Sequence, residues 1–550
     1  MTLSDRAQKR REDIIGKLTD REFDVVVIGA GINGAASAAA LAAGGARVAL
    51  IDKADFAGNT SSNSSSLVWG GIKYLENHEY RLVNKLCKGR NELREAFPTT
   101  VQEVRFLTTI RQGFRMPVWF VYLGTWLYWL FGRFATRRPH YLRTSQIHRR
   151  EPLIKTDDAV GGFEYSDCYL PDGDARFVWR FVQQCQRHGG VAANYMAVDR
   201  AERVGDMWHL SARDHVADQP LSIKARLVVN ACGPEVDALN MVVGQQTRFR
   251  HVFSKGVHLI VRRLTKDERV LTFFASDGRM FFVFPKGSRS CIGTTDTQVS
   301  TPYVGVTDED RDFILDNINN LLSLSEPLTR DDVIAERCGV RPLVTKGGAG
   351  EGTAADWLQL SRKHEIHCNE EEQYISIFGG KLTDCLNVGD EITSLVSQCG
   401  LNVGHANRGG LGEPGLKIKS EFDQFALDNG LDEHTASNSR GPLSVRLWRR
   451  YGLAAKGIAE DILAAPDKAR TLFANSSFTW AELEYSAANE MIESIDDLFR
   501  RRSSIALVVP WDERTQSETL LKVAEVLFDD RASEYVAQYL ALDGDSAVEA

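Results

Sequence analysis

Three glycines near the N-terminus have a spacing that suits dinucleotide binding. Gly29, Gly31 and Gly34 form a G-x-G-x-x-G pattern after the β-branched run 25–28, and an Ala-rich helix is expected over 35–43. The first glycine permits a tight turn, the second lets the backbone approach a pyrophosphate, and the third lets helix and strand pack closely. The helix N-terminus adds unpaired N–H groups for phosphate oxygens. The glycines alone do not separate NAD from FAD.

An acidic residue completes this unit. A second apolar run over 47–51 ends at Asp52, where a carboxylate can accept hydrogen bonds from a ribose. Strand, glycines, helix, strand and acid in this order predict a dinucleotide-binding βαβ unit. The alternative is a glycine turn in an unrelated α/β domain.

Two further strands are expected to end in glycine turns that lead into helices. The run 227–229 continues into Asn230 to Pro234, and the run 374–378 continues into Gly379 to Thr383. The stretches of about 100–165 and 250–335 alternate apolar and polar residues, which is typical of an antiparallel sheet. From about residue 405 the pattern is helical. These features predict one nucleotide-binding domain that is interrupted by insertions.

Composition narrows the class of protein. The 550 residues are 43% hydrophobic and 25% charged, which is ordinary for a globular chain, and the net charge of −8 argues against general nucleic-acid binding. The nine cysteines contain no C-x-x-C pair, so we expect reduced thiols in the cytoplasm.

One segment is unusually aromatic. Residues 116–131 include three tryptophans and two tyrosines, and arginines flank the segment on both sides. The run is shorter than the ~20 apolar residues that a membrane span needs. Aromatic side chains beside cations suit the headgroup level of one leaflet. We therefore expect contact with a membrane surface, and the alternative is a buried aromatic helix.

The hydroxyl-rich run Thr60 to Leu67, followed by Gly70 to Glu76, carries a resemblance to a known family. Together with ordered motifs downstream, the chain resembles the FAD-dependent glycerol-3-phosphate dehydrogenases of the D-amino-acid-oxidase-like superfamily. The further motifs are Gly162 to Cys168, Asp174-Ala175-Arg176, Lys255-Gly256 with His258, Ile292 to Asp296, Gly339 to Leu343, and Gly379 to Thr383.

The resemblance implies an α/β fold: a Rossmann-like FAD-binding domain, an inserted antiparallel-sheet substrate domain and a C-terminal α-helical domain. The implied boundaries are an N-terminal extension over 1–20, an FAD-binding domain over 21–100, 150–250 and 336–403, a substrate-binding and membrane-facing domain over 101–149 and 251–335, and a helical domain over 404–550. The residues expected to hold FAD are Gly29, Gly31, Asn33, Gly34, Asp52, Thr60, Ser61, Ser62, Ser65, Ser66, Leu67, Gly233, Gly380, Lys381, Leu382 and Thr383.

The resemblance also implies a reaction and its partners. The expected reaction is the oxidation of sn-glycerol 3-phosphate to dihydroxyacetone phosphate by hydride transfer to FAD, with the electrons passed to a membrane quinone. The protein would lie in the cytoplasm, peripherally associated with the inner (cytoplasmic) membrane, and a homodimer is possible.

Cations suit a phosphorylated substrate. By resemblance, the substrate contacts are Lys73, Tyr74, Arg341, Arg362 and Lys381. The resemblance implies that Arg341 is the main phosphate ligand, and the catalytic group is expected to contain His258, Lys381 and Arg341. A lone histidine on a strand is more often structural, so His258 could serve either the reaction or the fold.

The chain departs from the family at several positions of the expected site. Trp69 stands where a histidine is usual, Lys73 replaces an arginine, and Thr383-Asp384-Cys385-Leu386 replaces Thr-Thr-Tyr-Arg. Because tryptophan is no base, His258 or a water held by Lys or Tyr would take the hydroxyl proton.

These departures leave two other hypotheses open. One is a related FAD-dependent oxidase, or a dehydrogenase of another hydroxy acid or amine. The other is a protein that has lost catalysis and serves as a binding module. No metal site is expected, because His364 and His367 would point to opposite faces of a strand.

Overall fold

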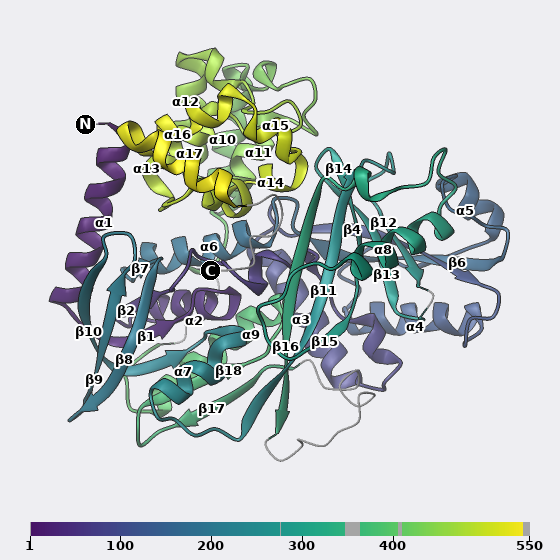
Figure 1. The fold of residues 1–550 in the computed structure, drawn as a ribbon. Coiled ribbons are helices and arrows are strands. Elements are labelled where there is room, and N and C mark those ends of the chain that lie inside the picture. The colour runs from purple at the N-terminus through teal and green to yellow at the C-terminus, as the bar shows by residue number, and fades with distance from the viewer. Residues whose placement is uncertain (1, 276, 347–362, 405–409, 543–550) are drawn as a thin grey trace.

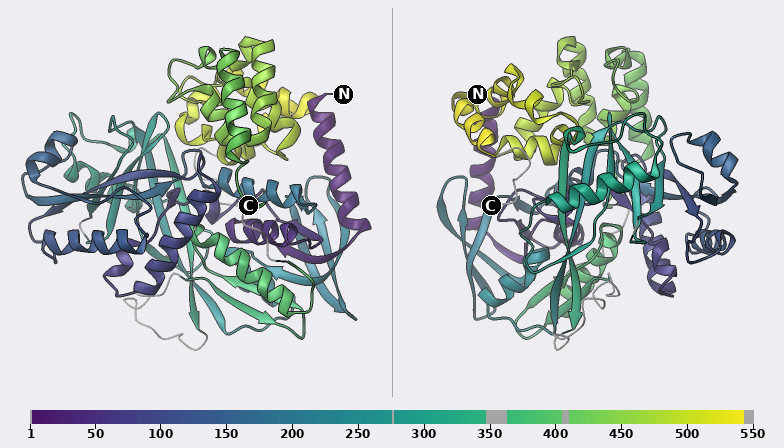
Figure 2. Two further views of the ribbon diagram at one scale, coloured as in Figure 1. Left: turned by 180° about the vertical axis from the view of Figure 1, so that it is seen from behind. Right: turned by 45° about the vertical axis from the view of Figure 1, so that its right-hand side comes forward.

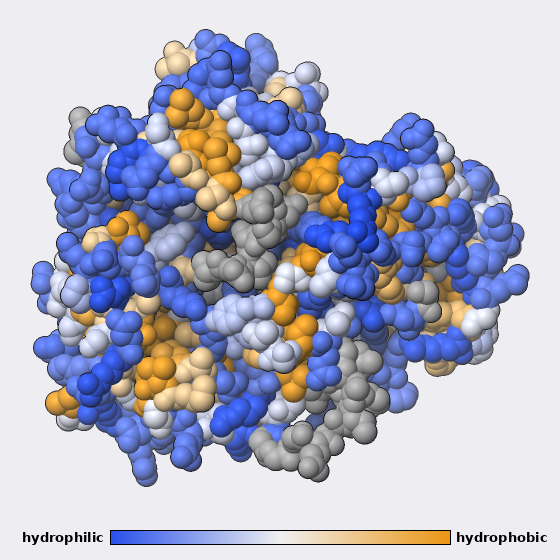
Figure 3. All heavy atoms as spheres, viewed as in Figure 1, coloured by the Kyte–Doolittle hydropathy of each residue, from blue (hydrophilic) through white to orange (hydrophobic). Residues whose placement is uncertain are grey.

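The computed structural model describes residues 2–275, 277–346, 363–404 and 410–542. Two β-sheets lie side by side, and the C-terminal helices form a group on one side of both (Figure 1). Helix α1 (Leu3–Asp20) and helix α4 (Val118–Phe131) lie at opposite ends of the molecule, as Figures 1 and 2 both show. On the face drawn in Figure 3, hydrophilic side chains predominate and hydrophobic ones form separate patches.

The first sheet is built around the predicted βαβ unit. Strand β1 (Glu22–Ile28) pairs in parallel with β2 (Val48–Ile51) and β10 (Gln219–Asn230). On the outer sides, β2 pairs in parallel with β7 and β10 pairs in parallel with β18. Because both faces of β1 are covered, residues 25–28 are all apolar and buried. The sheet order is β17-β18-β10-β1-β2-β7, with β8 and β9 joined through β10. The strands are β1 (Glu22–Ile28), β2 (Val48–Ile51), β7 (Val191–Ala193), β8 (Met196–Val204), β9 (Met207–Asp214), β10 (Gln219–Asn230), β17 (Glu365–Asn369) and β18 (Tyr374–Phe378).

Helices cover this sheet and share its core. The small side chains of α2 (Ile32–Ala43) let it pack against both α6 (Asp174–Arg187) and α9 (Cys385–Gln398). Helix α7 (Val236–Val242) follows β10, and α9 follows β18. The two predicted strand-to-turn-to-helix passages are therefore confirmed.

The second sheet is mostly antiparallel, with a parallel pairing of β4 and β12. Its longest ladder joins β11 and β16 from Phe249 opposite Lys346 to Ile260 opposite Ala335. The strands are β3 (Leu67–Val68), β4 (Gln102–Arg111), β5 (His140–Leu142), β6 (Ala159–Tyr169), β11 (Phe249–Arg262), β12 (Val270–Phe274), β13 (Met280–Lys286), β14 (Arg289–Gly293), β15 (Thr297–Val299) and β16 (Ala335–Lys346).

Three more helices accompany this sheet: α3 (Tyr80–Ala96), α5 (Thr144–Arg150) and α8 (Asp308–Leu321). The expected domain boundaries stay a prediction, because strand pairing alone does not divide a chain into domains. The pairing does place β6 and β16 in the second sheet.

The C-terminal region is helical, as predicted. A six-residue π-helix over Asp497–Arg502 lies between α13 and α14. The α-helices are α10 (Leu416–Asp428), α11 (Leu443–Tyr451), α12 (Ala455–Ala464), α13 (Trp480–Asn489), α14 (Ile505–Val508), α15 (Trp511–Thr515), α16 (Glu518–Phe528) and α17 (Ala532–Ala541).

Helix α4 exposes several of its large apolar side chains to solvent. Within it only Thr125 and Tyr128 are buried, whereas Trp119 is 63% exposed, Leu123 58% and Phe120 51%. The alternative of a buried aromatic helix is therefore wrong. No helix of the described ranges combines the length and the apolar character that a membrane span requires.

Candidate active site

The glycine loop joins β1 to α2 in a conformation that excludes side chains at two of its three glycines. Gly29 has a φ of +98°, and a Cβ there would lie 2.6 Å from the carbonyl oxygen of Ala231. A Cβ on Gly34 would overlap the carbonyl of Gly29. On Gly31 a Cβ would meet only the Ser61 hydroxyl, at 3.1 Å. Gly29 and Gly34 thus serve the packing of the protein, and Gly31 leaves its outer side open to a ligand.

Asp52 lies at the carboxyl end of β2 and supports the same loop. Its carboxylate accepts hydrogen bonds from the backbone N–H of Ala30 at 2.6 Å and of Ala54 at 3.0 Å. Burial raises the pKa of Asp52 to about 6, although these two N–H groups favour the ionised form. The carboxylate fixes the glycine loop at the place where a ribose acceptor is expected.

The hydroxyl-rich run passes between α2 and β16. The Ser61 hydroxyl accepts a hydrogen bond from the Ile32 N–H at the start of α2, at 3.0 Å, and Thr60 donates to the carbonyl of Val340 at 2.8 Å. Asp174 accepts from the Ser64 N–H at 2.8 Å. The run therefore links the first sheet to the second. Ser62 ends a 3₁₀ turn that begins at Thr60, Ser65 and Ser66 follow it, and Leu67 begins β3.

The loop after β18 meets the glycine loop from the other side. Asn33 donates from Nδ2 to the carbonyl of Gly379 at 2.9 Å, and a Cβ on Gly380 would lie 2.7 Å from that Nδ2. Leu382 and Thr383 form a 3₁₀ turn before α9, and Gly233 occupies the corresponding turn after β10. Three segments that are far apart in sequence thus surround the N-terminus of α2: the hydroxyl-rich run, the turn after β10 and the loop over 379–383 after β18.

These loops fit a dinucleotide cofactor. Within the described part of the chain, Asn33 Oδ1 and Ser66 Oγ are buried without a hydrogen-bond partner. Buried oxygens of this kind need a donor. Asn33 lies in the first turn of α2, where N–H groups and the helix dipole favour phosphate, and Ser66 lies near the end of the hydroxyl-rich run, directly before β3.

A second cluster of side chains lies beside the loop over 379–383. Lys381 Nζ donates a hydrogen bond to the Tyr74 hydroxyl and lies 3.9 Å from the centroid of the Tyr74 ring and 5.5 Å from that of Trp69. The backbone N–H of Trp69 donates to the Thr383 hydroxyl at 3.0 Å. Lys73 precedes Tyr74 in the same short turn. The structure therefore brings Lys381 and Thr383 together with Trp69 and Tyr74, which lie more than 300 residues earlier in the chain.

One face of the β11–β16 ladder carries the other predicted residues. Ser254, Gly256 and His258 alternate along β11 and lie opposite Arg341, Gly339 and Arg337 of β16. A Cβ on Gly339 would lie 2.9 Å from the carbonyl oxygen of Asn63. This face therefore packs against the hydroxyl-rich loop.

Arg341 is held in place on this face. Its guanidinium lies over Gly256, donates to the Thr294 hydroxyl at 3.4 Å, and pairs with Asp296 at 3.3 Å. Its side chain is 30% exposed. A planar cation in a fixed position, with part of its surface accessible, suits the recognition of phosphate or carboxylate.

His258 is buried near this arginine. Neither ring nitrogen has a hydrogen-bond partner in the described part of the chain. Burial, with Arg337 and Arg341 nearby, holds the pKa of His258 well below its usual value, so the imidazole is neutral. A neutral imidazole can accept a hydrogen bond or a proton, but its lowered pKa makes it a weaker base than a free histidine.

The loop over 379–383 connects the β11–β16 face with the cluster around Trp69. Gly379 donates its N–H to His251 at 3.2 Å, and a Cβ on Gly379 would lie 3.3 Å from the carbonyl oxygen of Pro342, next to Arg341. Arg341 and His258 belong to the β11–β16 face, and Lys381 and Tyr74 to the cluster around Trp69. Arg362 lies outside the described residues.

Arg337 was missed by the sequence analysis. It is 2% exposed, donates to the carbonyl of Ser62, and forms an ion pair with Asp174 at 3.0 Å. Its Nε and Nη1 have no partner among the described residues. Four positions separate it from Arg341 on one strand, and this even spacing was the signal that places both on the same face.

Asp384, an unusual residue for the expected family, has its charge compensated. It pairs with His364 at 2.8 Å and with Lys85 at 3.3 Å. Burial alone would raise the pKa of Asp384, but hydrogen bonds from His364 and Asn387 lower it below its usual value. Among the described residues, no group of three His, Cys, Asp or Glu side chains is arranged to hold a metal ion.

Comparison with known proteins defines the class. A family model described as FAD dependent oxidoreductase matches residues 24–361, so the chain belongs to this family of flavoproteins. FAD is therefore the cofactor of this chain. A second model, described as the C-terminal domain of alpha-glycerophosphate oxidase, matches residues 416–531.

Particular relatives narrow the comparison. The chain is 28% identical over 511 residues to an aerobic glycerol-3-phosphate dehydrogenase of Staphylococcus saprophyticus, covering 90% of this chain and 89% of that one. It is 29% identical over 520 residues to the protein of that name from Staphylococcus aureus, with the same coverage. The fold is similar to that of the glycerol-3-phosphate dehydrogenase from Bacillus halodurans complexed with FAD, with a TM-score of 0.74, 25% identity and coverage of 98% of both chains. The resemblance inferred from the motifs is confirmed, as is the predicted fold class.

Proposed function

We propose that the protein oxidises sn-glycerol 3-phosphate to dihydroxyacetone phosphate. The observation that carries this proposal is the position of Arg341 beside His258 on the sheet face that packs against the FAD-binding loop. An anion-binding cation and a neutral proton acceptor lie there on one face. The names of the relatives supply the substrate.

The phosphate of the substrate would bind to Arg341. Bidentate contact between guanidinium and phosphate fixes orientation as well as charge. Lys73, Lys381 and Arg362 are proposed as further cations around the substrate, and Tyr74 as a contact to its hydroxyls. Since Lys381 already bonds Tyr74, these two side chains would act as a unit.

The hydroxyl proton would go to His258. FAD, when bound, supplies the acceptor for the hydride of the substrate carbinol. A base within hydrogen-bond reach of the hydroxyl lowers the barrier of such an oxidation. His258 is neutral and has both nitrogens available, whereas Trp69 has no basic atom. A water held by Lys381 or Tyr74 is the alternative acceptor.

The electrons would pass to a membrane quinone. Support comes from α4, whose exposed Trp119, Phe120 and Leu123 form an apolar face at one end of the molecule. The flanking arginines, among them Arg115 and Arg133, would meet anionic headgroups. We propose that α4 lies in the interface of the cytoplasmic leaflet, which is the place for a peripheral protein that reduces a lipid-soluble acceptor.

A related flavoenzyme is the second candidate. The indole of Trp69 lies beside Lys381, and Lys73 offers a less directional charge than an arginine would. Both departures from the family pattern keep open an oxidase using O2, or a dehydrogenase of another hydroxy acid or amine.

An anaerobic titration of the FAD-loaded protein separates these candidates. Bleaching of the oxidised flavin bands by sn-glycerol 3-phosphate, and not by glycerol, is expected from phosphate recognition at Arg341. Re-oxidation by a soluble quinone analogue, compared with O2, then identifies the acceptor. Persistent flavin bands with sn-glycerol 3-phosphate would reject the substrate, and bleaching by another hydroxy acid or amine would favour the second candidate.

A further inference from the structure

The segment 52–57, between β2 and the hydroxyl-rich run, is attached to the glycine loop at both ends. At one end the Asp52 carboxylate accepts from the N–H of Ala30, and at the other the N–H of Ala57 donates to the carbonyl of Ala30 at 3.1 Å. Ala30 lies between the first two glycines of the cofactor loop. The conformation of this segment therefore sets the position of the backbone that approaches the FAD pyrophosphate.

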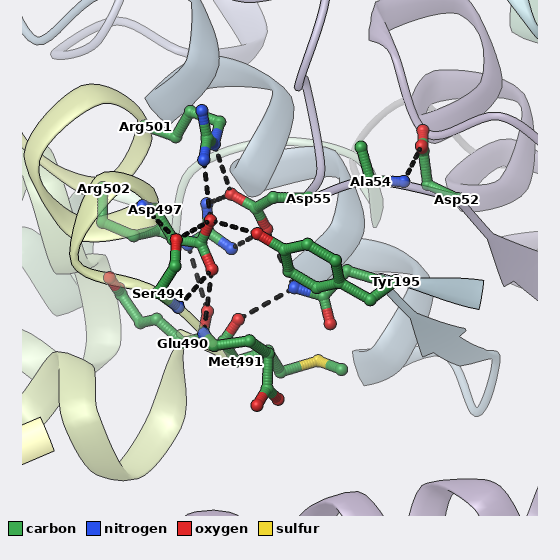
Figure 4. Close-up of polar contacts among 12 residues, drawn as sticks. Asp52, Ala54, Asp55, Tyr195, Glu490, Met491, Ser494, Asp497, Arg501 and Arg502 are labelled. Atoms are coloured by element: carbon green, nitrogen blue, oxygen red, sulfur yellow. Dashed lines mark hydrogen bonds and ion pairs between the residues drawn. The ribbon is translucent and has the colours of Figure 1, made fainter. Parts of the chain in front are cut away.

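The middle of the segment is held by the C-terminal region. Asp55 is 1% exposed and accepts two hydrogen bonds from Arg502, at 2.7 and 2.8 Å, and one from Arg501 at 2.7 Å (Figure 4). Both arginines come from the π-helix over Asp497–Arg502, more than 440 residues further along the chain. Burial alone would raise the pKa of Asp55, but Arg502 and Arg501 lower it, so the carboxylate is ionised.

A second connection runs parallel to the first. Tyr195 donates its N–H to the carbonyl of Ala54 at 3.0 Å and its hydroxyl to Asp497 at 2.6 Å. Asn194 donates to Asp55 and to the carbonyl of Met491, both at 2.9 Å. Asn194 and Tyr195, which follow β7, thus link the segment to Met491 and to the π-helix. Figure 4 shows the contact between Tyr195 and Asp497.

Aromatic side chains restrict the position of Arg502. The guanidinium of Arg502 lies 4.8 Å from the Trp179 ring centroid, and Trp179 packs against Phe56 of the segment at 5.7 Å. A buried ion pair that loses one partner leaves an uncompensated charge, which is strongly unfavourable. The segment would then move to restore solvation and would take Asp52 and Ala57 with it.

We propose that Asp55, Arg501 and Arg502 are positioning residues for FAD, through which docking of the C-terminal region and binding of the cofactor stabilise each other. These residues act through Asp52 and Ala30 and are not placed in contact with the substrate. Such coupling is reciprocal: whatever loosens the contact of Arg501 and Arg502 with Asp55 weakens FAD binding, and FAD in turn tightens that contact. The inference holds for whichever substrate the enzyme uses.

The first test is the affinity of full-length apoprotein for FAD, measured by quenching of flavin fluorescence. Asp55→Asn keeps the shape and removes the charge, and we expect its Kd to rise at least about tenfold, the effect of a modest coupling free energy. Tyr195→Phe should give a smaller rise in the same direction. At saturating FAD both variants should regain the kcat and KM of the wild type.

Glu413→Gln is the matched control. Glu413 joins the C-terminal region to the backbone and hydroxyls of Thr99 and Thr100, away from the segment 52–57. We expect it to lower the melting temperature without changing the Kd for FAD. An unchanged Kd in Asp55→Asn together with a lower melting temperature would overturn the proposal and leave the ion pairs a purely structural role.

Hydrogen exchange of the wild type decides the question if Asp55→Asn fails to fold. Addition of FAD to the apoprotein should slow exchange of the amides over 490–502, remote in sequence from every cofactor loop. Equal exchange of the amides over 490–502 with and without FAD would contradict the coupling.

Discussion

The guanidinium of Arg341 lies directly over Gly256, where a Cβ would come within 2.6 Å of its Cζ. The glycine therefore creates the space in which the proposed phosphate ligand sits. We expect Gly256→Ala to displace Arg341 and to raise the KM for sn-glycerol 3-phosphate roughly 10- to 100-fold, the value of a charged hydrogen bond. FAD content should not change, because the cofactor loops are untouched.

Steady-state kinetics with a matched glycine control test this. A Cβ on Gly457 of α12 meets nothing within 4 Å, so Gly457→Ala should leave the KM unchanged. Arg341→Ala should reproduce the KM of Gly256→Ala. A normal KM in both variants would remove Arg341 from the substrate site.

Substitutions at Gly31 and Gly34 should affect different properties, FAD binding in the first case and stability of the apoprotein in the second. A side chain at Gly34 overlaps the carbonyl of Gly29 within the protein itself, whereas at Gly31 it meets only the Ser61 hydroxyl at 3.1 Å. We expect Gly34→Ala to lower the melting temperature of the apoprotein. Gly31→Ala should leave that temperature nearly unchanged and weaken FAD binding, because its methyl group would occupy the approach to the pyrophosphate.

The two measurements are a thermal melt of the apoprotein and a titration with FAD. Full flavin content in Gly31→Ala would show that the pyrophosphate does not pass this residue. A normal apoprotein melt for Gly34→Ala would contradict the overlap that the structure shows.

Much of the fold was predictable because strand, turn and helix follow one another locally. The unit from β1 to Asp52 combines an all-apolar buried strand, a glycine turn and a small-residue helix, and each element is indicated by its own residues. The passages after β10 and β18 have the same character. The C-terminal helices were predictable in kind from their periodicity.

Contacts across the chain were not predictable in the same way. Nothing near Arg337 in the sequence indicates that it faces His258 and the carbonyl of Ser62, because the register of β11 and β16 decides this. The link between Asp55 and Arg502 spans most of the chain. The ion pair of Asp384 with His364 likewise depends on two elements that meet only in the folded protein.

The pKa of Asp52 predicts opposite pH effects on cofactor binding and on apoprotein stability. Burial raises this pKa to about 6, from a usual value of 3.8. We propose that ribose hydroxyls of FAD donate to the ionised carboxylate, so the affinity for FAD should fall by up to about tenfold per pH unit below 6. In the apoprotein the folded state binds the extra proton, so stability from this group falls as pH rises from 4 to 6, by at most about 3 kcal/mol.

Asp52→Asn is the comparison that isolates both effects. The FAD affinity of the variant should not share the decline of the wild type below pH 6. The difference in apoprotein stability between wild type and variant should change between pH 4 and pH 7 in the direction that favours the wild type at low pH. Parallel pH profiles for the two proteins would assign the titration to another group.

We expect His258 to affect kcat and not the binding of FAD. Its pKa lies well below the usual value, so it is neutral at neutral pH, and both its nitrogens lack partners among the described residues. We expect His258→Asn to lower kcat about 100-fold, a typical contribution of a general base, with FAD content retained. The flavin bands of the anaerobic variant should bleach slowly but completely. An unchanged rate of bleaching would favour the water held by Lys381 or Tyr74.

The exposed face of α4 should determine attachment to membranes. Trp119 and Phe120 are 63% and 51% exposed, and transfer of two such side chains into the interface contributes about 3 kcal/mol. Trp119→Glu with Phe120→Glu should therefore reduce co-sedimentation with anionic lipid vesicles roughly 100-fold, with flavin reduction by substrate unchanged. Leu427→Glu is the control, since Leu427 is 76% exposed but lies on α10 of the C-terminal region. Equal loss of vesicle binding in the control, or none in the α4 variant, would move the membrane contact away from α4 and with it the proposed route of electrons to a quinone.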